Sequence, residues 1–452
     1  MMKKGNKIAA LIAAGVILVP TVATTQVFAK ENSNAWSKNE TQLMELVEKG
    51  LSTDEILKDM NKLVIGDNAR VAGFKGEEAA AKYLAKEFKS LGLKAEIEDF
   101  DLDRPISVGN GYLNIDGESL FIKSFNGAEP IKADFNAEVV SVGLGLPEDI
   151  EKAGSLDGKV ALIERGNNSF AQKAANAYKA GAEAVIIFNN APGATTASLG
   201  DVPPQIPVLG MSQENGNKIK SKLEAGETVN LTKENFDIDI EYHENGESYN
   251  VIGTLKAANN HKKAKTIVLG AHFDSVSSPG ASDNASGTAV IVEVARLLSS
   301  KEIRKNLNYN IEFVAFGGEE LGLLGSKEYV EELKKDGRVE DIEAMINLDM
   351  VGVGDYINVF NLKNDLSSGF SALAAKHIKD GKGVYGGSYT NMSSSDHAPF
   401  EEAGIKASLV QTAPDPRYHT ENDTMEHIDS NNLYNVANVV ARMIIDMQDG
   451  TY

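Results

Sequence analysis

Hydrophobic and polar residues follow two different periods near the N-terminus. Apolar side chains recur every three to four positions over residues 35–50, 52–63 and 76–91, which predicts three amphipathic helices. Over residues 94–101 apolar and polar positions alternate instead, which predicts a strand. The chain is therefore expected to begin with helices and then to enter a sheet.

A separate pattern of short strands and helices occupies residues 135–223. Apolar runs predict strands at 139–142, 160–163, 184–188 and 207–210, and a helix over 171–179 that ends at Gly181. The stretch contains no histidine. It therefore predicts an inserted module that takes no part in metal chemistry.

From residue 250 onward, predicted strands and helices alternate. The strands fall at 266–270, 308–316 and 344–348, and the helices at 287–298 and 325–334. Strands separated by helices imply crossover connections, so we expect an α/β fold with a mixed, mainly parallel, doubly wound sheet flanked by helices. Ligands of such sheets bind beyond the carboxyl ends of the strands.

Composition limits the classes of protein that the chain can represent. Its 452 residues favour two domains plus a leader, and 42% hydrophobic residues with a mean hydropathy of -0.23 describe a soluble globular protein. A net charge of -20 argues against nucleic-acid binding, which needs clustered lysine and arginine. Cysteine is absent, which excludes disulfides and thiolate catalysis.

The N-terminus has the parts of an export signal. A lysine-rich start precedes an apolar stretch over residues 8–19, and Val27-Phe28-Ala29 suits cleavage before Lys30. The apolar stretch is shorter than the ~20 residues that span a bilayer. We therefore expect a signal peptide at 1–29 and a secreted protein without stable membrane insertion. Association with the cell wall is left open.

Residues with metal-binding chemistry lie where the predicted elements end. His272 follows a strand and can present one imidazole nitrogen to a metal while Asp274 accepts the other N–H. Asp283 enters the turn before the helix at 287–298, where one carboxylate can bridge two metals. Taken singly, a hydrogen-bonded structural histidine and a helix cap are the simpler interpretations.

Further acids follow the next two strands. Glu319 and Glu320 come after a strand and two glycines, and adjacent carboxylates point in different directions. This suits one as a metal ligand and the other as a general base, with a solvated acidic turn as the alternative. Asp349 ends a buried-looking strand, where a metal would offset the cost of an unpaired carboxylate.

The last cluster lies after the proline-rich turn at 413–416. His419 offers a second imidazole, and Tyr418 a hydroxyl that can stabilise an oxyanion. The Ser-Asp-His segment at 395–397 is expected to support the ligands from outside. The remaining histidines have no usable acidic pattern around them and are expected to be ordinary: His243, His261, His377 and His427.

Two segments carry a resemblance to the protease-associated domain. They read GKVALIERG at 158–166 and KAGAEAVII at 179–187. The resemblance implies a lid or a substrate-gating module, and a purely structural insertion is the alternative.

The ordered residues His272, Asp283, Glu319-Glu320, Asp349 and His419 resemble the ligand set of the co-catalytic zinc aminopeptidases of peptidase family M28. With the inserted module, the chain is similar to secreted Bacillus-type members of that family. The resemblance implies two zinc ions per subunit and hydrolysis of the N-terminal residue of peptides by a metal-activated water.

Each zinc ligand follows from the same resemblance. His272 and Asp349 would hold one zinc, and Glu320 and His419 the other. Asp283 would bridge the two ions.

The same resemblance implies that Glu319 is the general base and that Tyr418 is the oxyanion donor.

The alternatives are a metal-dependent carboxypeptidase or deacylase of the same fold, or a non-catalytic binding protein. The oligomeric state is left open. The expected domains are the signal peptide at 1–29, a peptidase domain in two parts at 30–127 and 248–452, and the protease-associated insertion at 128–247.

Overall fold

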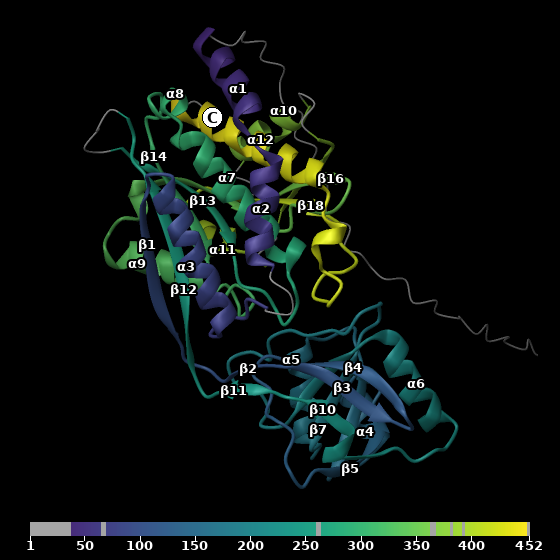
Figure 1. Ribbon diagram of the computed structural model, residues 1–452. Coiled ribbons are helices and arrows are strands. Elements are labelled where there is room, and N and C mark those ends of the chain that lie inside the picture. Colours follow the sequence, from purple (N-terminus) through teal and green to yellow (C-terminus); the bar gives the residue numbers. More distant parts are fainter. Residues whose placement is uncertain are drawn as a thin grey trace, which may run out of the picture.

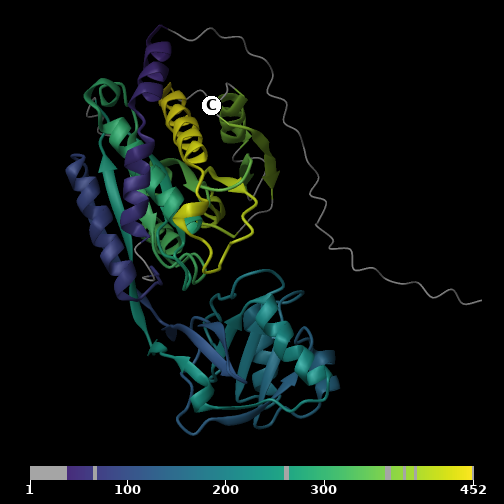
Figure 2. The same ribbon diagram turned by 45° about the vertical axis from the view of Figure 1, so that its right-hand side comes forward.

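The structure is a computed structural model that describes residues 38–64, 69–258, 264–361, 368–379, 383–390 and 394–449. The expected signal peptide and the first residues of the first expected helix lie outside these ranges, as does His261. Figures 1 and 2 show two units joined by a pair of strands, with helices covering the larger unit.

The helices expected near the N-terminus and along the second half are confirmed. They are α1 (Lys38–Gly50), α2 (Thr53–Leu63), α3 (Lys75–Ser90), α7 (Gly287–Ser299) and α9 (Leu324–Lys335). Ser52 caps α2, because its side chain accepts the backbone N–H of Glu55. The sequence did not single out α8 (Lys301–Arg304), α10 (Ser368–Lys379), α11 (His397–Glu402) or α12 (Ser430–Asp446).

An eight-stranded mixed sheet forms the larger unit, in the order β1-β12-β14-β13-β15-β18-β16-β17. The strands are β1 (Lys94–Leu102), β12 (Gly246–Leu255), β13 (Thr266–His272), β14 (Asn310–Phe316), β15 (Ile342–Leu348), β16 (Tyr356–Asn361), β17 (Tyr385–Thr390) and β18 (Ala407–Ala413). Four neighbours, β14, β13, β15 and β18, run parallel. Their carboxyl ends therefore meet at one edge, as the expected doubly wound fold requires.

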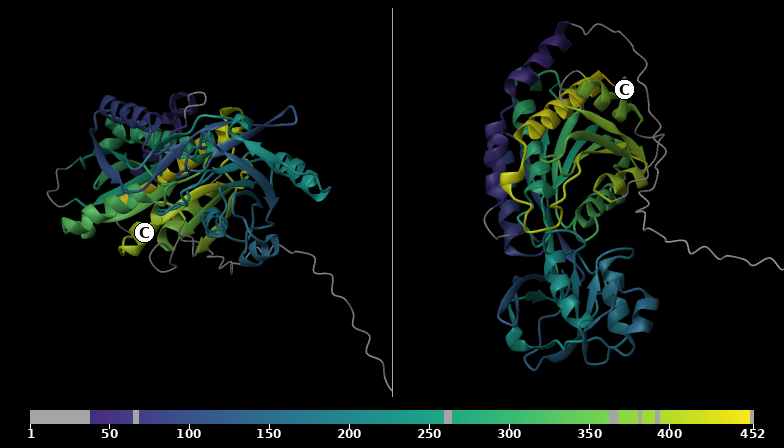
Figure 3. Two further views of the ribbon diagram at one scale, coloured as in Figure 1. Left: turned by 90° about the horizontal axis from the view of Figure 1, so that it is seen from below. Right: turned by 90° about the vertical axis from the view of Figure 1, so that its right-hand side faces the viewer.

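Helices cover both faces of this sheet. The first face packs against α3 and α7, over which α2 and α12 lie, and α9 and α11 contact the second face. Helix α7 is apolar around most of its surface, so it is buried between the sheet and the outer helices. Figure 3 shows this layered unit beside the smaller one.

The smaller unit is an insertion built on a second eight-stranded sheet, in the order β10-β3-β4-β8-β7-β6-β5-β9. Its strands are β3 (Asn110–Ile115), β4 (Glu118–Ser124), β5 (Asn136–Ser141), β6 (Lys159–Glu164), β7 (Ala184–Phe188), β8 (Val208–Met211), β9 (Asn230–Thr232) and β10 (Phe236–Ile238). Its helices are α4 (Pro147–Ala153), α5 (Phe170–Lys179) and α6 (Gln213–Glu224).

The chain enters and leaves the insertion along one antiparallel pair. It leaves the larger unit on β1 and returns on β12, with Leu102 opposite Gly246. The short strands β2 (Ile106–Val108) and β11 (Glu241–His243) pair next. Strands β3 and β4 lie before residue 128 yet belong to the insertion's sheet, so we propose that the insertion begins near Ile106.

None of the helices in the described ranges has the length and apolar character that crossing a bilayer requires.

Candidate metal centre

Four of the expected residues lie at or just beyond the ends of three neighbouring parallel strands. His272 is the last residue of β13, and it is in register with Phe316 at the end of β14. The turn after β14 carries Glu319 and Glu320, and Asp349 directly follows β15. The parallel register thus brings residues 77 positions apart within 3.3 Å of each other, from His272 Nε2 to Asp349 Oδ1.

Asp283 lies in the turn that precedes α7, and other residues hold this turn by its backbone. The Asp423 carboxylate accepts the N–H of Ser282 at 2.7 Å and of Asp283 at 3.0 Å. The Asn284 side chain donates to Leu348 O at 2.8 Å and accepts from Met350 N at 3.2 Å. The turn is therefore tied to the segment that carries Asp349.

His419 lies in the loop that follows β18. Its backbone has φ of 61°, in the left-handed region that non-glycine residues rarely adopt. The next residue stabilises the bend, because Thr420 N and Oγ1 both donate to Arg417 O, at 3.0 and 2.7 Å. The loop thereby turns the His419 ring toward the strand ends.

The five expected ligands form two groups that share Asp283. His272 Nε2 lies 3.2 Å from Asp283 Oδ1, and His419 Nε2 lies 3.3 Å from Asp283 Oδ2. Asp349 completes the first group, and Glu320 the second, with Glu320 Oε2 3.0 Å from His419 Nε2. Within each group, the ligand atoms all lie within 4.8 Å of one another.

Burial of these charges perturbs their protonation. Burial raises the pKa of Glu320 to about 7 and raises that of Glu319 well above its usual range. Burial opposes protonation of both imidazoles, but the surrounding carboxylates, Glu320 above all, raise the pKa of His419 to about 10. Glu319 and Asp349 likewise raise the pKa of His272. The side chains around the site therefore carry too little positive charge to neutralise this cluster of carboxylates.

Divalent cations fit the residues present. Glu320 Oε1 is buried without a hydrogen-bond partner among the described residues, and His419 Nε2 lies near two acids but makes no well-directed hydrogen bond. Such atoms are costly to bury unless something binds them. Imidazole nitrogens with carboxylate oxygens are the ligands that zinc takes in catalytic sites.

Glu319 and Tyr418 face the same hollow but belong to neither ligand group. The hollow has a volume of about 260 Å³ and is also lined by Asp283, Gln411 and Asp415. The Tyr418 ring stacks on the His419 ring with centroids 3.7 Å apart, and Tyr418 is 41% exposed. A larger hollow, of about 620 Å³, lies over β1 and β12 beside α9 and contains none of the site residues.

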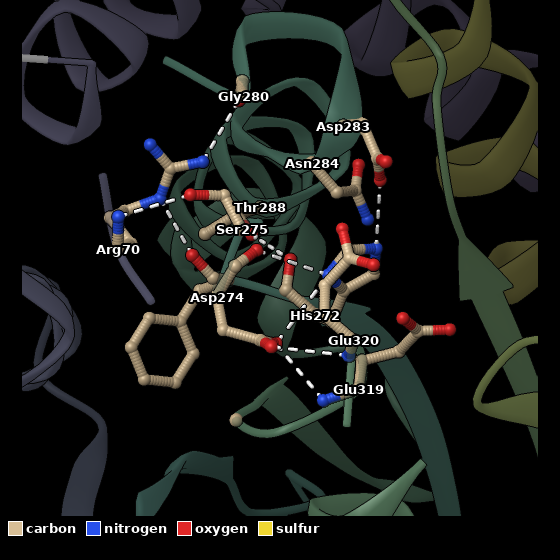
Figure 4. A network of polar contacts seen from close by, with 12 residues as sticks. Arg70, His272, Asp274, Ser275, Gly280, Asp283, Asn284, Thr288, Glu319 and Glu320 are labelled. Atoms are coloured by element: carbon tan, nitrogen blue, oxygen red, sulfur yellow. Dashed lines mark hydrogen bonds and ion pairs between the residues drawn. The ribbon is translucent and has the colours of Figure 1, made fainter. Parts of the chain in front are cut away.

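Asp274 connects the His272 strand to the glutamate turn. Its carboxylate accepts the backbone N–H of Glu319 at 3.1 Å and of Glu320 at 3.2 Å (Figure 4). The expected contact with His272 is present in a different form. His272 Nδ1 lies 3.2 Å from the Asp274 carbonyl oxygen and 3.6 Å from its carboxylate. Asp274 therefore orients the ring and also fixes the turn.

The segment at 395–397 lies behind the first ligand group. Ser395 Oγ donates to Asp349 Oδ2 at 2.8 Å and accepts from Asn347 Nδ2 at 2.7 Å. Asp396 and His397 are fully buried next to it. Of the histidines expected to be ordinary, His377 pairs with Asp446 at 3.0 Å, away from the site.

Sequence reasoning missed three residues that support the site: Arg70, Glu77 and Asp423. The buried Arg70 guanidinium donates to the carbonyls of Leu63, Phe273, Pro279 and Gly280, and so holds the loop that follows β13. Glu77 accepts from Ser248 Oγ and from Gly73 N. No local motif marks these residues, because each partner is distant in the sequence or is a backbone atom.

Imidazoles and carboxylates that converge beyond the ends of parallel strands define a metal-dependent hydrolase. Comparisons with known proteins also indicate a metal-dependent hydrolase. A profile of peptidase family M28 matches residues 250–444, and a PA domain profile matches residues 132–219. Aminopeptidase YwaD of Bacillus subtilis (strain 168) is 32% identical over 97% of this chain and 92% of its own.

Solved structures show the same likeness. BSAP, a zinc aminopeptidase from Bacillus subtilis, has a TM-score of 0.71 and 30% identity, covering 89% of this chain and 97% of its own. An aminopeptidase from Aneurinibacillus sp. strain AM-1 has a TM-score of 0.65 and 33% identity over 89% of this chain and 95% of its own.

The chain belongs to peptidase family M28 and contains a PA domain. The resemblance to zinc aminopeptidases of this family, and the fold class that it implied, are confirmed.

Proposed function

We propose that this family M28 aminopeptidase is secreted and uses two zinc ions to remove the N-terminal residue of peptides. One observation carries the proposal. The Asp283 carboxylate lies between two imidazoles, 3.2 Å from His272 and 3.3 Å from His419, with one further acid beside each ring. A single carboxylate in this position suits a bridge between two cations.

The ligand roles follow from the two groups. His272 and Asp349 would hold one zinc, Glu320 and His419 would hold the other, and Asp283 would contribute to both groups. When bound, the two ions supply Lewis-acid polarisation of the scissile carbonyl and an activated water.

Glu319 is the proton carrier. It lines the hollow beside the ligands but takes part in neither group, so its carboxylate is available for proton transfer. From this position its carboxylate can accept a proton from the attacking water. Glu319 then returns that proton to the leaving amine.

Tyr418 completes the reaction site from the exposed side. Its ring is held by stacking on His419, and its position on the rim of the hollow lets the hydroxyl donate to the developing oxyanion. The stacking places the proposed donor directly beside a proposed metal ligand.

The charge of the hollow supports recognition of a free N-terminus. The described lining contains Asp283, Glu319, Glu320, Asp349 and Asp415, and neither lysine nor arginine. Two bound zinc ions would offset the charge of Asp283, Glu320 and Asp349, which leaves Glu319 and Asp415 as acids that favour an α-ammonium group over a C-terminal carboxylate. An aminopeptidase is therefore favoured over a carboxypeptidase that uses the same ligands.

Secretion rests on the export signal at residues 1–29. N-terminal sequencing of the protein from the culture medium should begin at Lys30, and recovery of the full-length chain only from cells would contradict secretion.

A panel of peptides tests the activity. Purified protein should contain two zinc ions and should cleave a free dipeptide amide, but neither its N-acetylated form nor an N-acyl amino acid. Preference for the acetylated substrates would identify a deacylase. Zinc binding without any cleavage would identify a binding protein.

A further inference from the structure

The loop that carries His419 is held from two sides. On the side of the peptidase unit, Asp423 binds the Asp283 turn through its carboxylate, and its carbonyl accepts the N–H of Ala281 at 3.2 Å. This anchor lies four positions after His419. The left-handed backbone of His419 persists only if its surroundings hold it, since such conformations are strained for a residue other than glycine.

On its other side the same loop contacts the insertion. The backbone N–H of Ala194 donates to Glu421 Oε2 at 2.9 Å. Gly193 packs against Thr420 so closely that a β-carbon at Gly193 would lie 2.7 Å from Thr420 Cβ. The insertion therefore contacts the first and second residues after His419.

A buried lysine of the insertion faces the same carboxylate. The Lys123 side chain, on β4, is 1% exposed, and its Nζ lies 3.9 Å from Glu421 Oε2. This nitrogen has no hydrogen-bond partner among the described residues. Burial lowers the pKa of Lys123 to about 8, while Glu421 and Asp423 oppose that change. A buried ammonium is costly without a nearby anion, so Lys123 and Glu421 depend on each other.

We infer that Glu421 is a positioning residue through which the insertion holds the Tyr418-His419 loop in its metal-binding conformation. The inference rests on the proposed function and deepens it. The insertion then acts on the metal group of Glu320 and His419, and leaves the group of His272 and Asp349 unchanged. A module that only gates substrate access would act on neither group.

Four variants distinguish the hydrogen bond between Ala194 and Glu421 from the ion pair between Lys123 and Glu421. Glu421→Ala removes both the N–H acceptor and the charge, and Glu421→Gln keeps an acceptor for Ala194 but leaves Lys123 unpaired. Lys123→Met removes the buried charge alone, and the double variant Lys123→Met/Glu421→Gln restores a neutral pair with the hydrogen bond intact. Glu426→Ala is the matched control, because Glu426 is 77% exposed and contacts neither Lys123 nor Ala194.

Zinc affinities, measured by competition with chelators, give the first readout. Glu421→Ala should lower the affinity for the zinc of Glu320 and His419 by about 10–100-fold, the usual effect of losing a group that orients a ligand. The affinity for the zinc of His272 and Asp349 should not change. Its kcat should fall at limiting zinc and recover with excess zinc, with KM within about twofold of wild type. The double variant should recover most of the affinity that Glu421→Gln loses, and Glu426→Ala should match wild type.

Hydrogen exchange on the metal-free protein gives a readout that does not depend on activity. Glu421→Ala should speed exchange across residues 415–423 while β13 and β15 stay protected. Unchanged exchange there, equal weakening of both zinc ions, or a change in KM alone would overturn the inference. If wild type binds no zinc, the proposed function fails, and hydrogen exchange still decides whether Glu421 holds the loop.

Discussion

The backbone N–H of Glu319 donates to the Asp274 carboxylate at 3.1 Å, so one buried acid holds the turn that carries Glu319 and Glu320, the proposed base and the proposed ligand. The adjoining N–H of Glu320 donates to the other oxygen of the same carboxylate. Because Asp274 also lies two residues after His272, it couples a histidine ligand on β13 to the glutamates after β14.

Asp274→Asn should weaken this coupling while it preserves the side-chain shape. The asparagine side chain has one oxygen, so its amide group would face one backbone N–H and lose that hydrogen bond. We expect activity or zinc affinity to fall about 10–100-fold. Measurement of kcat and zinc content checks this, and Asp355→Asn, at an exposed position, should behave as wild type. Wild-type activity in Asp274→Asn would contradict the assigned role.

Asp283→Ala should lose both metal ions and activity together. Its carboxylate is the one group that both sets of ligands share, so each set retains only two ligands without it. Zinc analysis after dialysis checks the prediction, with Asp355→Ala as the control. Two tightly bound zinc ions in Asp283→Ala would show that Asp283 does not bridge them.

Glu319→Gln and Glu320→Gln should fail in different ways. Glutamine at 319 is nearly isosteric but cannot take a proton, so both zinc ions should remain while kcat falls about 10²–10⁴-fold with KM changed much less. Glutamine at 320 should instead weaken the zinc shared with His419. Zinc content and kcat, measured for both variants, check the prediction. Loss of a zinc in Glu319→Gln, together with loss of turnover alone in Glu320→Gln, would mean that the two roles are exchanged.

Arg296→Met should destabilise the fold without direct effect on the site. Arg296 Nη2 pairs with Asp59 at 3.0 Å, and Nη1 pairs with Glu293, and both acids are buried. Removal of the guanidinium leaves two buried acids uncompensated, which costs about 3–5 kcal/mol for a broken buried pair. Urea denaturation measures this loss.

Arg338→Met is the matched control for Arg296→Met. Its side chain is 48% exposed, and its nearest acid, Asp341, is a solvent-exposed partner. Loss of such a pair should change the free energy of unfolding by less than about 1 kcal/mol. Equal losses in the two variants would show that the buried network does not stabilise the fold.

Periodicity predicted the strands that carry the site. An apolar run ending at His272 and another ending before Asp349 required buried strands, and buried strands separated by helices are parallel neighbours. The convergence of these two residues therefore followed from their positions in the chain. By contrast, strand β16, the edge strand β17 and helices α10 to α12 were not predicted from the sequence.

Local sequence determined the chemistry, and tertiary packing determined how it is held. Residue types near predicted strand ends and turns indicated candidate metal ligands, because ligands of a parallel sheet bind beyond the ends of its strands. The resemblance to family M28 supplied their expected roles. The clamp of Asp423 on Asp283 joins residues 140 positions apart, and the contact of Ala194 with Glu421 joins residues 227 positions apart. No local period encodes such pairs, since their energy arises only when tertiary folding buries polar groups from distant segments together.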